Sequence, residues 1–183
     1  WRIKTVFDQL DNAFFPTHGW RVEGNWMQGR SLRRGDSSGP EGRVRHLELQ
    51  GQTVRSWGTH TLNLGARLGL SDGVSPDIPR YGLGGFQMLS GYAPFQVSGQ
   101  QIALLRLGYM VRLTDMALTR GLFLGSSFEV GNAWDKPEDV GRGKKRTGMS
   151  LYLGADTAFG PVYLAVVHSP VVGPTLMLFV GRP

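Results

Sequence analysis

Long stretches of this sequence alternate apolar and polar residues with a period of two, and this alternation restricts the possible folds more than any other feature. In "THTLNLGARLGL", residues 59–70, the leucines and Ala66 point to one face, while Asn63 and Arg67 point to the other. The pattern recurs in "QQIALLRLGYMVRL" (100–113), "GLFLGSSFEVGNAW" (121–134) and "TGMSLYLGADT" (147–157). Such alternation predicts β-strands with two chemically different faces.

The predicted strands are numerous and long. Weaker alternation adds strands at 1–8, 19–30, 42–57, 161–168 and 175–181, which makes about nine in the chain. Several have 11 to 14 residues, whereas strands of soluble proteins centre on about five or six and a tilted strand needs about 9 to 11 to cross a bilayer. The expected fold class is therefore all-β, a transmembrane antiparallel β-barrel.

The connections between the predicted strands alternate in length. Those near Pro16, Gly58, Met116 and Gly160 are short, and those at 31–41, 71–99 and 134–146 are long. Barrels of the bacterial outer membrane have short periplasmic turns and long extracellular loops. The expected location is therefore the bacterial outer membrane.

Length and charge are consistent with this interpretation. The 183 residues suffice for one domain, 1–183, and the absence of cysteine excludes disulfides. The chain begins at Trp1 without a signal sequence, so we expect a processed or excised piece of a longer protein.

The net charge is +6, and a basic rim on the long-loop side is expected to meet membrane lipid and the phosphates of lipopolysaccharide. Its residues are Arg33, Arg34, Arg142, Lys144, Lys145 and Arg146. No nucleic-acid motif is present.

A soluble barrel remains an alternative. A lipocalin-like barrel or sandwich that binds a small apolar ligand would have the same alternation, with its leucines pointing inward. The polar face of the predicted strands combines arginines, Glu23, Glu129 and Asp156 with many glycines. That chemistry favours a wet or plugged lumen over a solvent-facing surface rich in lysine.

No catalytic constellation is expected. "GDSSG" at 35–39 matches the G-x-S-x-G elbow of serine hydrolases, but Ser37 lies between loop segments and not between a strand and a helix. The four histidines have no metal-ligand spacing. We expect no metal, no cofactor and no enzymatic activity in this chain.

Four motifs resemble the BamA superfamily of outer-membrane barrels, the bacterial surface antigen domain. "DNAFFPTHGW", with Asp11, Pro16 and Gly19, is similar to its D-x-x-x-F-P-T-x-G turn. "GGFQMLSGY" lies where that family has a long loop ending in R-G-Y/F, and "FEVGNAW" resembles its D/E-x-G-x-x-W strand end. "GADTAFGPVYL", with Gly160 and Pro161, resembles its penultimate turn. The residues of the motifs "LSGY", "GNAW" and "GADTAFGPVYL" are most similar to those of barrels that follow patatin-like phospholipase domains in type V secretion proteins.

The resemblance implies that the loop 71–99 enters the barrel lumen. In the family the arginine of the loop motif binds an acidic residue on the inner wall. Here Ser90 stands at the arginine position before Gly91 and Tyr92, and Glu129 matches the acidic position. We expect Arg106 or Arg112 to pair with Glu129 instead, the alternative being a carboxylate hydrated in a wet lumen. The apolar loop residues, from Phe86 to Phe95, are expected to pack on Gly108, Gly125 and Gly131.

The resemblance also implies a function and leaves one question open. The chain would be the C-terminal part of a BamA-type barrel, a membrane anchor and translocation or assembly pore for a patatin-like domain outside this chain. Nine strands do not close an ordinary antiparallel barrel. Either the chain is part of a larger barrel, or residues 19–183 close as eight strands with 1–8 outside, or two copies join their edges as a homodimer.

Overall fold

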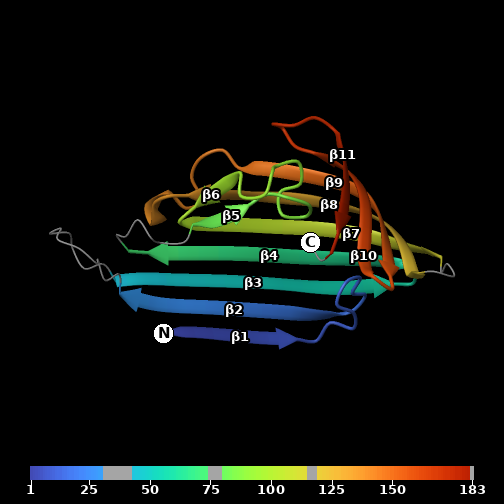
Figure 1. Ribbon diagram of the computed structural model, residues 1–183, viewed down its shortest axis with the longest axis horizontal. Helices are drawn as coiled ribbons and strands as arrows, with labels where there is room; N and C mark the ends of the chain where they lie inside the picture. Colours follow the sequence, from blue (N-terminus) through green and yellow to red (C-terminus); the bar gives the residue numbers. More distant parts are fainter. Residues whose placement is uncertain (31–42, 74–79, 115–118, 182–183) are drawn as a thin grey trace.

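A computed structural model describes residues 1–30, 43–73, 80–114 and 119–181 (Figure 1). One nine-stranded antiparallel sheet dominates, in the order β1-β2-β3-β4-β7-β8-β9-β10-β11, and β5 and β6 form a separate two-stranded sheet. The strands are β1 (Arg2–Asp8), β2 (Gly19–Arg30), β3 (Arg43–Trp57), β4 (His60–Asp72), β5 (Tyr81–Leu83), β6 (Val97–Gly99), β7 (Gln101–Thr114), β8 (Thr119–Trp134), β9 (Arg146–Thr157), β10 (Gly160–His168) and β11 (Thr175–Val180). A single 3-10 turn, Pro137–Asp139, lies between β8 and β9. Among the described residues no helix is long and apolar enough to cross a membrane.

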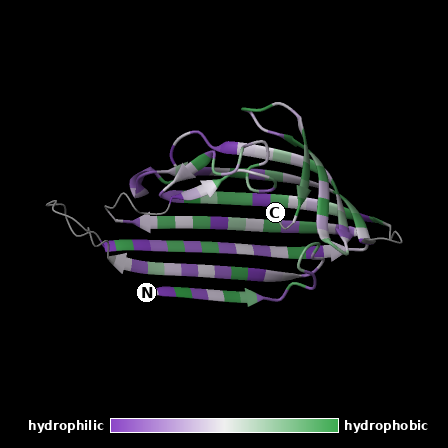
Figure 2. Ribbon diagram, in the orientation of Figure 1, coloured by the Kyte–Doolittle hydropathy of each residue, from purple (hydrophilic) through white to green (hydrophobic). Residues whose placement is uncertain are grey.

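The nine predicted strands are confirmed. Each strand of the large sheet begins and ends within two residues of its predicted bounds. The lengths also hold, since β3, β7 and β8 have 15, 14 and 16 residues. Hydropathy alternates along these strands in the structure as it does in the sequence (Figure 2).

The two faces of the sheet differ in exposure. We define the inner face as the one covered by residues 81–99 and the outer face as the opposite one. Six leucines on the outer face of β4, β7 and β9 are between 40% and 57% exposed; they are Leu62, Leu64, Leu105, Leu107, Leu151 and Leu153. A soluble barrel with its leucines inward is therefore not the structure of this chain.

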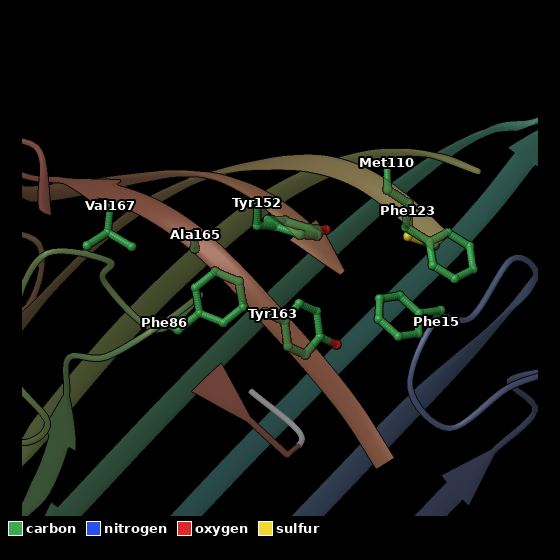
Figure 3. Packing of buried hydrophobic residues seen from close by; sticks show 8 residues of the cluster. All are labelled: Phe15, Phe86, Met110, Phe123, Tyr152, Tyr163, Ala165 and Val167. Carbon is green, nitrogen blue, oxygen red and sulfur yellow. The ribbon is translucent and has the colours of Figure 1, made fainter. Parts of the chain in front are cut away.

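Segments from both ends of the strands fill the inner face. Phe15, in the turn between β1 and β2, stacks on Phe123 of β8 with ring centroids 4.4 Å apart. Phe86, in the segment between β5 and β6, lies 5.2 Å from Tyr163 of β10, and Phe15 lies 5.3 Å from the same ring. Figure 3 shows Tyr163 between these two phenylalanines. The main buried cluster thus joins a short turn and a long loop through the ring of Tyr163.

The sheet has two open edges. All seven residues of β1 pair with β2, and β11 pairs with β10. No pairing joins β1 or β2 to β11 among the described strands. The alternative in which residues 19–183 close as eight strands, with 1–8 outside the sheet, is therefore wrong.

Candidate functional site: the seat of the inner loop

A row of mostly polar residues crosses the inner face at one level. In the large sheet, strand register places one residue each of β1, β2, β3, β4, β7, β8 and β9 directly opposite the next. We call this set the polar row: Asp8, Arg21, Gln52, Gly65, Arg106, Glu129 and Gly148. At one end of the row, Arg21 and Asp8 form an ion pair of 2.7 Å.

The loop between β4 and β7 lies on this face, as the resemblance implied. At its base the Tyr81 hydroxyl donates to the Leu47 carbonyl at 2.7 Å, and its ring stacks on His46 with centroids 4.2 Å apart. The Arg67 guanidinium donates to the Gly82 carbonyl at 3.3 Å and pairs with Glu48 at 2.7 Å. These contacts fasten the loop base to the wall formed by β3 and β4.

The loop tip is fastened to Glu129. The Ser90 backbone N–H donates to Glu129 Oε2 at 2.9 Å, and the Ser127 hydroxyl donates to Glu129 Oε1. Ser127 in turn bonds to Ser150 at 2.6 Å. Because Glu129 and Ser90 have no exposed surface, the hydrated alternative is wrong. The carboxylate is held by the loop backbone and by the Ser127 hydroxyl, which is itself bonded to the Ser150 hydroxyl.

The described hydrogen bonds of Glu129 do not come from the two arginines expected to pair with it. Arg106 lies directly opposite Glu129 in the register, but its guanidinium donates to the side chains of Gln87 at 3.1 Å and Gln52 at 3.2 Å. Arg112 donates to the carbonyl of Arg120 at 3.2 Å, near the end of β7. The backbone amide of position 90 therefore takes the place that the resemblance gives to an arginine side chain.

Gly148 permits this close approach. A Cβ atom at Gly148 would lie 2.5 Å from the Ser90 nitrogen and 2.6 Å from the Ser90 oxygen, closer than such contacts occur. Gly91 follows Ser90 in the loop tip and has φ of +86°. The Gly91 carbonyl accepts a hydrogen bond of 3.3 Å from the hydroxyl of Ser169, which lies in the connection between β10 and β11. Tyr92 is buried in a second apolar cluster with Leu89.

The predicted loop packing is correct in part. Phe86, Leu89 and Tyr92 are buried, but Phe95 is 68% exposed. The glycines that receive the loop are not the expected ones, since the space above Gly125 is filled by Tyr152, and Gly148 lies beneath Ser90. Sequence reasoning missed Gly148, Ser127, Ser150, Gln52 and Gln87. Their faces follow from the alternation, but their proximity depends on register between strands.

The first turn motif is built around Asp11. Its carboxylate accepts the backbone N–H groups of Thr17 at 2.8 Å and His18 at 3.1 Å, and also the Thr17 hydroxyl. Burial raises the pKa of Asp11, but these hydrogen bonds outweigh it, so the pKa lies below its ordinary value of 3.8. Gly19 has φ of +107°, and a side chain there would meet the Gln9 carbonyl. Pro16 is buried beside Phe15, so the motif aims Phe15 inward.

The second turn motif closes the β9–β10 hairpin. Gly160 has φ of +107°, and its carbonyl accepts the Thr157 hydroxyl at 2.6 Å. Pro161 follows as a buried residue of β10. Both motifs thus lie in short turns at the same end of the antiparallel sheet.

The basic rim is described only in part. Arg142, Lys144 and Lys145 are exposed between β8 and β9, and Arg146 is exposed at the start of β9. The Trp134 indole donates to the Arg142 carbonyl at 2.8 Å, which fixes the segment to the end of β8. Arg33, Arg34 and the Ser37 motif lie outside the described residues. Within the described ranges, no three His, Asp or Glu side chains are grouped so that they could hold a metal ion.

Structural similarity to a known protein identifies the fold. No protein-family model and no curated protein matches the sequence. Among solved structures, the chain is similar to BamA from Haemophilus ducreyi lacking POTRA domains 1–3, with a TM-score of 0.70 and 10% sequence identity. The match covers 97% of this chain and 40% of that one. The chain therefore has the fold of a part of a BamA-type β-barrel.

Proposed function

We propose that this chain forms part of the membrane-spanning wall of a BamA-type β-barrel in the bacterial outer membrane. The observation that carries the proposal is the contrast between its faces. Leucines remain exposed along the outer face, while Glu129 is completely buried under a loop on the inner face. Transmembrane barrels have this arrangement, with an apolar band toward lipid and polar groups toward the lumen.

The ends of the strands support a membrane position. Trp20, Trp57 and Trp134 lie at or next to strand ends, where interfacial aromatic residues anchor a membrane protein. The exposed Arg142, Lys144, Lys145 and Arg146 follow Trp134 by a short distance in sequence. We propose that they bind the phosphates of lipopolysaccharide through charge-assisted hydrogen bonds.

The open edges require strands from outside the described sheet. Edge strands in lipid leave backbone groups unsatisfied. In an antiparallel sheet of nine strands, β1 and β11 run in the same direction. A second copy inserted with the same orientation would therefore meet either edge in parallel. We propose that an odd number of further strands closes the barrel, because only then is every pairing antiparallel and the total even.

We further propose that the barrel anchors a patatin-like phospholipase domain outside this chain and provides its translocation or assembly pore. Support comes from the motifs "LSGY", "GNAW" and "GADTAFGPVYL", whose sequences resemble those of barrels attached to such domains. In this proposal the barrel itself has no enzymatic activity, and any lipase activity resides in the attached domain.

The membrane proposal is tested by electrophoresis in SDS with and without boiling. A folded outer-membrane barrel resists SDS, so we expect the unboiled full-length protein to migrate differently from the boiled one and to require detergent for purification. A protein that is soluble without detergent and shows no shift in migration would contradict the proposal. Loss of the phospholipase domain from the outer membrane after deletion of the barrel would support the anchoring role, and its retention there would contradict it.

A further inference from the structure

A groove crosses the outer face of the sheet along one register level. Strand pairing places one residue from each of five strands side by side, a set we call the outer row: Leu62 of β4, Tyr109 of β7, Ser126 of β8, Leu151 of β9 and Val166 of β10. All five line the groove, which has a volume of about 540 Å³. Because the short side chain of Ser126 lies between Tyr109 and Leu151, it leaves a depression in the middle of the row.

A cation lies at one end of the outer row. Arg55 of β3 is directly opposite Leu62, and its guanidinium carbon lies 5.8 Å from the centroid of the Trp57 ring. Arg55 is exposed, and it forms no ion pair with any residue that the structure describes. Its positive charge therefore has no anion within the described sheet, although it lies beside an apolar groove.

A second polar group lies beside Arg55. His60 is opposite Trp57 at the start of β4, and its Nδ1 shares a hydrogen bond of 2.6 Å with the hydroxyl of Tyr109. The Nε2 atom of this exposed histidine has no partner among the described groups. Diagonal neighbours on one face of an antiparallel pair lie about 7 to 8 Å apart, so Arg55 and His60 can reach the same anion.

The outer row moves away from the short turns as it leaves Arg55. Arg55 lies two residues before the end of β3, whereas Leu151 lies six residues before the end of β9 and Val166 six residues after the start of β10. These strand ends adjoin short turns, which share one side of an outer-membrane barrel. In a membrane the groove would therefore run from Arg55, near the short-turn surface, toward the middle of the apolar band.

We propose that the outer row binds one anionic phospholipid from the leaflet on the short-turn side. Its phosphate lies at Arg55 and His60, and one acyl chain lies in the groove over Ser126. Arginine donates charge-assisted hydrogen bonds to phosphate, and the neighbouring Trp57 is of a residue type enriched at membrane interfaces. The acyl chain packs on the exposed side chains of the row by dispersion contacts. The inference rests on the proposed membrane barrel.

The experiment measures lipid retained by the folded full-length protein in native mass spectrometry, during a titration with phosphatidylglycerol. Arg55→Gln removes the cation, and Ser126→Leu fills the groove without a change of charge. Arg45→Gln is the control for charge, because Arg45 is on the same face of β3 but at its other end, opposite Asp72. Ala66→Leu is the control for volume, because Ala66 is a small exposed residue of β4 that does not line this groove. Unboiled electrophoresis shows whether each variant is folded.

We expect the wild type to retain one phosphatidylglycerol. Arg55→Gln should raise the dissociation constant on the order of tenfold, as expected for the loss of a hydrogen bond to a charged group. Ser126→Leu should also weaken retention, and the two control variants should resemble the wild type.

Three results would overturn the lipid site and leave the barrel intact. They are a folded wild type that retains no lipid, equal losses from Arg55→Gln and Arg45→Gln, which would mean general charge attraction, and unchanged retention by Ser126→Leu. A full-length protein that does not resist SDS when unboiled would instead contradict the proposed function itself.

Discussion

At the scale of single residues, Ser90 shows that a contact can be kept while its chemistry changes. A backbone N–H reaches Glu129 only where the loop backbone touches the wall, and Gly148 provides that space. A buried carboxylate that loses a donor is left with the cost of desolvation. Position 90 has no cationic side chain to pair with Glu129. Because Gly148 has no side chain, the Ser90 backbone N–H can reach the carboxylate instead.

Gly148→Ala is expected to unseat the loop tip. The added methyl group would overlap backbone atoms of Ser90, and such overpacking costs about 1 to 3 kcal/mol. The measurement is the temperature at which the folded band disappears on an SDS gel, which should fall. Gly29→Ala in β2 is the matched control, because a Cβ there meets nothing within 4 Å. Equal effects of the two substitutions would argue against a close seat.

Asp11 is expected to make the first turn sensitive to acid. Its pKa is lower in the folded chain than the ordinary 3.8, so its stabilisation is complete above that value and is lost as pH falls through the folded pKa. Hydrogen exchange at the Thr17 and His18 amides, relative to the intrinsic rate, should accelerate below pH 3.8 and should not do so in Asp11→Asn. The amides of Phe14 and Phe15, held by the non-titrating Asn12, are the internal control. Protection of Thr17 that does not change with pH would refute this assignment.

At the scale of elements, alternation explains both the strands and the segments between them. A strand with one apolar face and one polar face requires a different medium on each side. The outer face of β4 leaves Leu62 and Leu64 exposed, while its inner face carries the polar side chains of Thr61, Asn63 and Arg67. The loop completes the inner face by burying Leu83 and Leu89 against the wall.

Adjacent substitutions in β4 are expected to differ strongly. Leu64→Arg places a charge on the outer face, and a cation near the bilayer midplane costs roughly 2 to 4 kcal/mol in a transmembrane barrel. Asn63→Arg places its charge on the polar inner face, beside a cavity that Asn63 lines together with Gln52 and Thr61, and should cost much less. The free energy of unfolding in lipid vesicles measures both. Equal costs, or the reverse order, would mean that the faces are assigned wrongly.

At the scale of the whole molecule, the open sheet is the dominant feature. Nine strands bring β1 and β11 to the two edges with the same direction. Ile3 and Phe7 at one edge, and Leu176 and Leu178 at the other, are exposed on strands that have one partner each. Exposed edges template pairing with other strands, so both edges are available to the further strands that we propose.

Because closure by a second copy would require parallel seams, cysteines at the edges should not link two chains. Residues 1–183 contain no cysteine, so Thr5→Cys and Leu178→Cys each place a single thiol in this part of the protein. A short thiol crosslinker should give no dimer in membranes that contain both variants. The control is Leu49→Cys with Leu68→Cys in one chain, which lie directly opposite in β3 and β4 and should link. A crosslinked dimer from the edge variants would establish closure by two copies.

Much of the fold followed from the sequence because it depends on local chemistry. Strand bounds and the two chemical faces could be predicted, since side-chain alternation and turn residues act over a few positions. The inward loop was implied by the resemblance to the BamA superfamily and not by local chemistry. The hydrogen-bond donor that binds the Glu129 carboxylate could not be predicted from the sequence. Alternation shows that Glu129 and Arg106 face inward, but it does not show which donor of the loop reaches the carboxylate.

The sequence alone determined the strand count, the strand lengths and the two chemical faces, because each of these repeats along neighbouring residues. Only the tertiary structure decided that Ser90, 39 residues before Glu129, donates its backbone N–H, and that Ser169, 78 residues after Gly91, holds the loop tip. It also decided that β1 belongs to the sheet and that both edges stay open. Register between strands fixes these contacts, and register is a property of the whole sheet.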